Sequence, residues 1–123
     1  MSEERQKLVY LLNDGAERAE KVLTALALAN IGLAMESDVT ILLFGEATRL
    51  AYKGYGETVH SIDRLPMSKL IRDFIDNGGK VRICGPCLKV RQVDPSLLIE
   101  GVEPTTGTVV NNTFLEADKV ISW

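Results

Sequence analysis

The chain has two cysteines, and both lie in the segment Cys84-Gly85-Pro86-Cys87. A short run with β-branched residues, 81–83, comes directly before them, and a helical pattern with Leu88 and Val90 comes after. This order places the Cys-x-x-Cys where a buried strand ends and a helix begins, the position at which open α/β sheets carry their chemistry. We therefore expect thiol chemistry at this junction.

The surroundings of the pair favour a reactive thiol. A helix N-terminus has free backbone N–H groups and partial positive charge, and both stabilise a thiolate over a thiol. The thiolate is the nucleophilic form of cysteine. Four cationic residues flank the motif: Lys80, Arg82, Lys89 and Arg91. A cysteine at the end of a buried strand is also commonly an inert small hydrophobe, so an unreactive pair remains the alternative.

Composition narrows the class of protein. The 123 residues suit one domain over 1–123, with residues 1–6 frayed, and the hydrophobic content of 46% is enough for a core. The net charge is −3 and no basic face or arm stands out, so we expect no nucleic-acid partner. We expect no signal peptide, because the first residues lack a basic start followed by an apolar run, and the apolar stretch 22–35 is too short to span a bilayer. We expect a cytoplasmic protein without a membrane segment, in which a cysteine pair handles sulfur or redox chemistry rather than forming a structural disulfide.

Hydrophobic runs and helical patterns alternate along the chain. We predict strands at 7–12, 39–44, 58–62, 81–84 and 119–122. The run 58–62 is the weakest of them. Helices are predicted at 16–35, 46–52 and 67–77, after Cys84, and up to about 117 from a cap at Thr105 or Thr106. This alternation indicates an α/β fold of three layers (α/β/α) around a five-stranded, mostly parallel sheet.

The loops after the strands are expected to meet at one edge of that sheet. Asn13 and Asp14 follow the first strand and Gly45-Glu46 follows the second, so these loops are candidates to support the cysteines. The Asn13-Asp14-Gly15 turn lacks the glycine spacing of dinucleotide or phosphate-binding loops. A plain turn with an Asx cap is the competing interpretation.

Several segments together resemble the DsrE/DsrF-like family, which includes the TusD-type sulfur-relay subunits. The resemblance spans nearly the whole chain, beginning with an apolar strand that leads to a long Ala/Leu-rich helix. It continues with Phe44-Gly45 after the second strand, Asn-Gly-Gly before the strand that ends at Cys84, Arg91 seven residues later, and the ending 117–121. Gln92 departs from the family pattern, in which many members have glycine after the arginine.

The resemblance implies a compact α/β domain that assembles into trimers or hexamers, sometimes from different subunits, and we expect a homotrimer or homohexamer here. It also implies a sulfurtransferase or sulfur carrier in which Cys84 holds a persulfide, taken from a donor protein and passed to an acceptor protein. Gly85 and Arg91 would support this site. Cys87 is a secondary site, because it either resolves the persulfide with release of sulfide or is a buried helix residue. No metal and no organic cofactor is required.

Two other functions remain open. Cys-Gly-Pro-Cys is typical of thioredoxin-like thiol–disulfide oxidoreductases, but here the motif comes late and no aromatic residue stands just before it. A non-catalytic oligomeric binding module of the same fold is the second alternative. A structural zinc site needs four ligands, whereas the chain offers two cysteines and the single histidine His60, so we expect no metal.

Overall fold

The computed structural model describes residues 5–58 and 65–123. Its strands are β1 (Lys7–Leu12), β2 (Asp38–Leu43), β3 (Lys80–Cys84), β4 (Val102–Thr105) and β5 (Lys119–Ser122). The α-helices are α1 (Ala19–Ala34), α2 (Met67–Asp76), α3 (Gly85–Val90) and α4 (Gly107–Glu116). Short 3₁₀ helices lie at η1 (Ala16–Arg18), η2 (Gly45–Ala51), η3 (Gly56–Thr58) and η4 (Pro95–Leu97).

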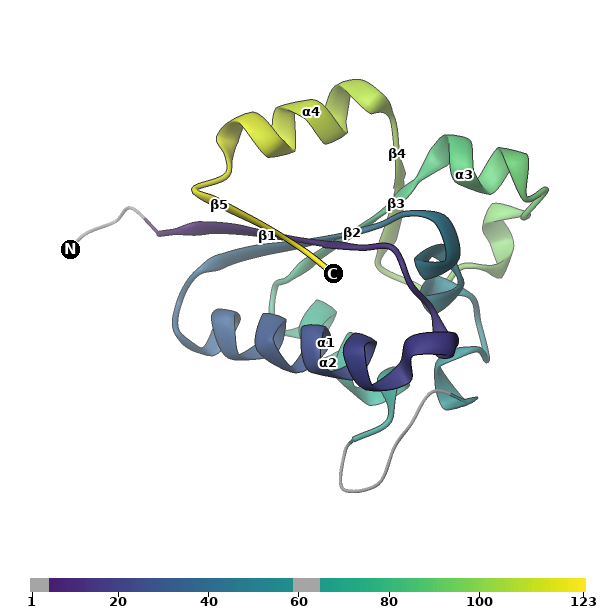
Figure 1. Ribbon diagram of the computed structural model, residues 1–123, viewed down its shortest axis with the longest axis horizontal. Helices are drawn as coiled ribbons and strands as arrows, with labels where there is room; N and C mark the ends of the chain where they lie inside the picture. Colours follow the sequence, from purple (N-terminus) through teal and green to yellow (C-terminus); the bar gives the residue numbers. More distant parts are fainter. Residues whose placement is uncertain (1–4, 59–64) are drawn as a thin grey trace.

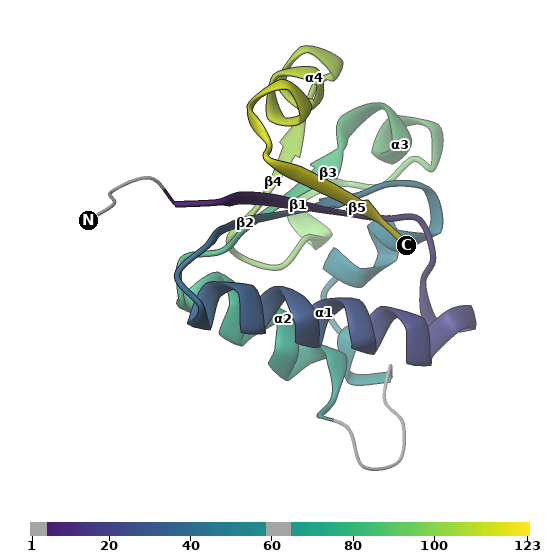
Figure 2. The ribbon, with the colours of Figure 1, turned by 60° about the vertical axis from the view of Figure 1, so that its left-hand side comes forward.

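The strands form one five-stranded sheet in the order β4-β3-β2-β1-β5, and every neighbouring pair is parallel. Helices α1 and α2 cover one face of this sheet, and α3 and α4 lie over the other (Figures 1 and 2). The predicted three-layer α/β/α fold with a five-stranded, parallel sheet is therefore confirmed. Within the described ranges, no helix has both the length and the apolar character that crossing a membrane requires.

The core lies between the sheet and the α1–α2 layer. Apolar side chains of the three central strands, such as Leu12, Ile41 and Ile83, pack there against α1 and α2, and Phe74 of α2 is fully buried among them. A strand covered on both faces needs apolar residues at successive positions, which is why β1 and β2 read as continuous hydrophobic runs.

The opposite layer is much less buried. No residue of α4 is buried, and Leu88 is the one buried residue of α3. A polar contact joins α4 to the sheet, because Arg82 of β3 donates a hydrogen bond from Nη1 to Thr113 Oγ1 at 3.1 Å. Arg82 was expected to add positive charge beside the cysteines, and this hydrogen bond to a neutral hydroxyl leaves that charge in place.

One strand differs from the prediction. The sheet contains the strand β4, which the sequence pattern did not indicate. Its residues Glu103 and Pro104 are exposed at the edge of the sheet, where proline is tolerated because one side of the strand needs no ladder partner. The predicted strand 58–62 is wrong at Thr58, which belongs to the 3₁₀ helix η3, and its remainder lies outside the described residues.

The helices mostly follow the prediction, with differences at their starts. The helix predicted from residue 16 begins as the 3₁₀ turn η1 before α1, and the helix predicted at 46–52 is the 3₁₀ helix η2. Thr106, rather than Thr105, caps α4: its Oγ1 accepts a hydrogen bond from the Val109 backbone N–H at 3.4 Å. The side chain of Thr105 is therefore not used for capping.

Candidate functional site

Cys84 is the last residue of β3 and the N-cap of α3. The Cys87 backbone N–H donates a hydrogen bond to Cys84 Sγ over 3.1 Å. The two sulfur atoms are joined in a disulfide, with the Cα atoms 5.2 Å apart, a separation usual for such bonds. The bond joins residues only three positions apart, so it restricts the unfolded chain far less than a disulfide that closes a long loop.

Both cysteines are half-buried, and Pro86 between them is exposed. A thiol at either position is therefore neither sealed in the core nor fully solvated. This differs from an inert cysteine packed within a strand, for which complete burial is usual. The placement suits a sulfur that a partner's thiol must reach.

Gly85 is required by close packing. A Cβ atom at this position would lie 2.6 Å from the backbone oxygen of Thr105, at the end of β4. The turn that carries the cysteines therefore presses directly against the adjacent edge strand. This contact is what supports the prediction that Gly85 holds the cysteine turn in place.

Thr105 adjoins the cysteine pair, and sequence reasoning missed its place there. It is the register partner of Cys84 in the parallel pairing of β3 with β4. The residue is 7% exposed, and within the described parts of the chain its Oγ1 has no hydrogen-bond partner. The sequence offered no signal for this juxtaposition, because β4 itself was not predicted.

Arg91 lies at the C-cap of α3, and its side chain turns toward η2. Its Nη1 is 2.7 Å from Glu46 Oε2, and Glu46 also pairs with Arg49. The charge of Arg91 is thus matched by a carboxylate. In this structure Arg91 fixes α3 against the loop after β2.

Asn13 and Asp14 lie at the same edge of the sheet but farther from the cysteines. They follow β1, which is separated from β3 by β2. Asn13 Nδ2 donates to the backbone oxygen of Trp123 at 3.3 Å, and the Asp14 carboxylate pairs with Lys21 Nζ at 3.0 Å. None of the hydrogen bonds or ion pairs of the described residues joins either side chain to Cys84. Their support of the site remains a prediction.

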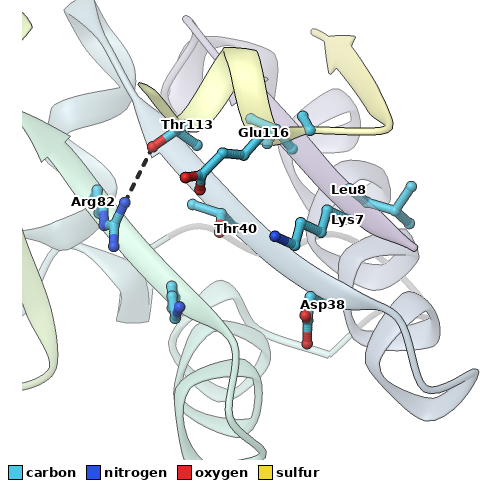
Figure 3. A pocket seen from close by; sticks show the side chains of 10 residues that line it. Lys7, Leu8, Asp38, Thr40, Arg82, Thr113 and Glu116 are labelled. Carbon is cyan, nitrogen blue, oxygen red and sulfur yellow. Dashed lines mark hydrogen bonds between the residues drawn. The ribbon is translucent and has the colours of Figure 1, made fainter. Parts of the chain in front are cut away.

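A separate polar pocket of about 120 Å³ opens under the C-terminal part of α4 (Figure 3). It mixes cationic, acidic and hydroxyl side chains, among them Lys7, Arg82, Thr113 and Glu116. It lies toward the strand starts, away from the cysteine edge.

Across residues 5–58 and 65–123, no three His, Cys, Asp or Glu side chains gather in the way metal ligands would. His60 lies outside the described residues.

The sequence model of the DsrE/DsrF-like family matches residues 6–123. The chain belongs to the DsrE/DsrF-like family. It is 30% identical over 115 residues to an uncharacterized protein of Methanopyrus kandleri, covering 93% of this chain and 91% of that one. It is 28% identical over 96 residues to an uncharacterized protein of Methanocaldococcus jannaschii, spanning 77% of this chain but only 35% of the relative.

Solved structures share the fold of this DsrE/DsrF-like chain. The crystal structure of the YchN protein from E. coli superposes with a TM-score of 0.81 at 20% identity, covering 98% of this chain and all (100%) of that one. A protein of unknown function from Methanobacterium thermoautotrophicum, MTH1491, superposes with a TM-score of 0.70 at 14% identity, with coverage of 98% and 100%. At these identities the likeness concerns the fold alone.

Proposed function

We propose that this DsrE/DsrF-like protein is a sulfur carrier that accepts a sulfane sulfur on Cys84 and passes it to an acceptor protein. The observation that carries the proposal is the position of Cys84, half-buried at the end of β3 with the Cys87 backbone N–H on its sulfur. A hydrogen bond to a sulfur anion is stronger than one to a neutral thiol, so this contact favours the reactive thiolate.

The transfer is an exchange between sulfur atoms. The Cys84 thiolate attacks the outer sulfur of a donor persulfide, the donor's S–S bond breaks, and the donor leaves as a thiolate. An acceptor thiolate then attacks the outer sulfur now held by Cys84, and Cys84 leaves as a thiolate. Each step forms one S–S bond and breaks one, so neither requires a metal, an organic cofactor or an external oxidant.

The disulfide must be reduced before Cys84 can accept sulfur, which suits the reducing cytoplasm. The same bond supports a role for Cys87. Its thiolate attacks Sγ of a Cys84 persulfide, the outer sulfur leaves as hydrosulfide with its proton, and the Cys84–Cys87 disulfide remains. A dithiol reductant would then restore both thiols. This intramolecular route also supports the second candidate function, a thiol–disulfide oxidoreductase.

Assembly into a homotrimer or homohexamer is part of the proposal. Helix α4 has large apolar side chains in solvent, with Leu115 82% exposed and Val109 39% exposed. Of its ten residues, Glu116 alone is charged, whereas the solvent-facing side of a helix on a globular protein usually carries charged and polar residues. Sedimentation velocity at micromolar concentration tests this part, and a monomer there contradicts it.

Mass spectrometry of the intact protein tests the carrier function. The protein is reduced, freed of reductant and incubated with glutathione persulfide as the sulfane-sulfur donor. We expect the wild type to gain one sulfur atom and Cys84→Ser to gain none. Cys87→Ser is the matched variant, because it retains Cys84 and should hold the added sulfur longer than the wild type. Equal sulfur uptake by Cys84→Ser would refute the proposal.

Released sulfide separates the two candidate functions. If Cys87 resolves the persulfide, the wild type releases sulfide and returns to the disulfide, whereas Cys87→Ser releases little. An oxidoreductase without carrier activity reduces a protein disulfide such as that of insulin, loses this activity in Cys87→Ser, and takes up no sulfur.

A further inference from the structure

The Thr105 hydroxyl is buried beside the cysteine pair without a hydrogen-bond partner. The residue is 7% exposed, and Oγ1 is unpaired within residues 5–58 and 65–123. Burying an unpaired hydroxyl costs free energy, so native structures rarely retain one without a reason. The other buried threonine, Thr48, follows the rule, because its Oγ1 donates to the Gly45 backbone oxygen at 2.8 Å.

The position of Thr105 relates it directly to Cys84. The two residues are register partners in neighbouring parallel strands, so their side chains leave the sheet on the same face. The contact between Gly85 and the Thr105 backbone holds the end of β4 against the cysteine turn. The side chain of Thr105 is therefore the neighbour of the Cys84 side chain across the β3–β4 pair, on the same face of the sheet.

A change in the oxidation state of the cysteines would offer this hydroxyl a partner. In the disulfide, Cys84 Sγ is neutral and bonded to Cys87, and a neutral sulfur is a weak acceptor. Reduction frees rotation about the Cys84 Cα–Cβ bond and gives a thiol, which becomes an anionic sulfur when it loses its proton. An anion is a strong acceptor, and a neighbouring hydroxyl is a suitable donor for it.

We propose that the Thr105 hydroxyl donates a hydrogen bond to the reduced Cys84 sulfur. The Cys84 thiolate would then be stabilised by two donors, the Cys87 backbone N–H and the Thr105 hydroxyl. The inference rests on the proposed function in one respect: Cys84 is taken to be the reactive sulfur. It assigns Thr105 a role in the reduced site and none in the disulfide form.

This role predicts opposite effects on stability and reactivity. Thr105→Val retains the shape of the side chain and removes the hydroxyl. In the disulfide form the variant should be as stable as the wild type or more stable, because an unpaired buried polar group is lost. In the reduced form Cys84 should be less reactive. If the hydroxyl had a purely structural role, Thr105→Val would instead lower the stability of the protein.

The test measures alkylation of Cys84 by iodoacetamide against pH, in reduced protein that carries Cys87→Ser so that one thiol remains. Thr105→Val should move the midpoint of the pH–rate profile upward by about 1 pH unit, which makes alkylation below the midpoint about tenfold slower. Thr105→Ser retains the hydroxyl and should retain the midpoint. Thr40→Val is the control, because Thr40 lies on β2 and pairs with Lys80, at the far end of β3 from Cys84.

An unchanged midpoint in Thr105→Val overturns the inference, as does an equal shift in Thr40→Val. If Thr105→Val does not fold, Thr105→Ala is compared with Thr105→Ser, and equal midpoints in these two overturn it as well. The alkylation readout is independent of sulfur transfer. A shifted midpoint without sulfur uptake refutes only the carrier function, and sulfur uptake without a shift refutes only the role of Thr105.

Discussion

The guanidinium of Arg91 lies 2.7 Å from the carboxylate of Glu46, which ties α3, the helix that contains Cys87 and follows Cys84, to the 3₁₀ helix η2 after β2. The two side chains are 30% and 39% exposed, so solvent screens the pair and its contribution to stability is modest. The pair joins the C-terminal end of α3 to η2 near the carboxyl edge of the sheet.

A double-mutant cycle measures this ion pair. We expect Arg91→Met and Glu46→Gln to show a coupling of about 0.5 kcal/mol in urea unfolding at low salt, typical of partly exposed pairs. The coupling should fall toward zero at about 1 M NaCl, because the ions screen the charges. A coupling that does not change with salt would mean that packing, rather than charge, joins α3 to η2.

The contact at Gly85 predicts a clear difference between two glycines. Gly85→Ala would place a methyl group against the Thr105 backbone oxygen, 2.6 Å away, and should lower the free energy of unfolding by about 1–3 kcal/mol. Gly107→Ala is the control: no atom lies within 4 Å of its would-be Cβ, and it begins α4. We expect it to be neutral or to stabilise by up to about 1 kcal/mol. Equal stability of the two variants in thermal unfolding would contradict this account.

The lowered pKa of the Asp94 carboxyl predicts that the stability of the fold depends on pH in the acid range. Its pKa is lowered from the ordinary value of 3.8, because the Ser96 backbone N–H donates to its carboxylate and a side-chain hydrogen bond from Ser96 adds to the effect. Between the folded pKa and 3.8 the unfolded chain binds more protons, so stability rises with pH there and is lost as the pH falls through the folded pKa.

NMR measures this effect at the site. The Asp94 carboxyl carbon should titrate with a midpoint below 3.8, and the Ser96 amide signal should follow the same curve. Asp94→Asn keeps an acceptor for the Ser96 amide but removes the titrating group. In that variant the Ser96 signal should no longer respond in this range. A midpoint at or above the ordinary value would show that the hydrogen bond from the Ser96 amide does not lower the pKa of Asp94 in solution.

The hydrogen bond from Arg82 to Thr113 should control how firmly α4 lies on the sheet, since none of the α4 residues is buried. We expect Arg82→Met to speed hydrogen exchange of the α4 amides by about fivefold to tenfold, the equivalent of one hydrogen bond, with little change in β1 and β2. Lys80→Met is the matched control, because Lys80 lines the same pocket from the same strand. Equal exchange in the two variants would assign the anchoring of α4 to other contacts.

The sequence by itself determined the class of fold and the position of the cysteines along it. Segments such as 7–12 and 39–44 are mostly apolar at successive positions, which is typical of a strand covered on both faces, and helical patterns separate them. Alternation of this kind implies a parallel sheet. The Gly-Pro pair after 81–83 likewise marked the strand-to-helix junction that holds Cys84, because these residues end a strand and begin a helix.

Only the tertiary structure decided which side chains surround that junction. The strand β4 is short, and its exposed Glu103 and Pro104 give no hydrophobic pattern, so neither the strand nor the place of Thr105 beside Cys84 was predictable. Arg91 and Glu46 meet through the order of strands, a long-range property that local sequence does not encode. Asn13 follows β1, and the same order places that strand beyond β2 from the cysteines. Strand order arises from the packing of the whole chain, whereas strand identity arises from local burial.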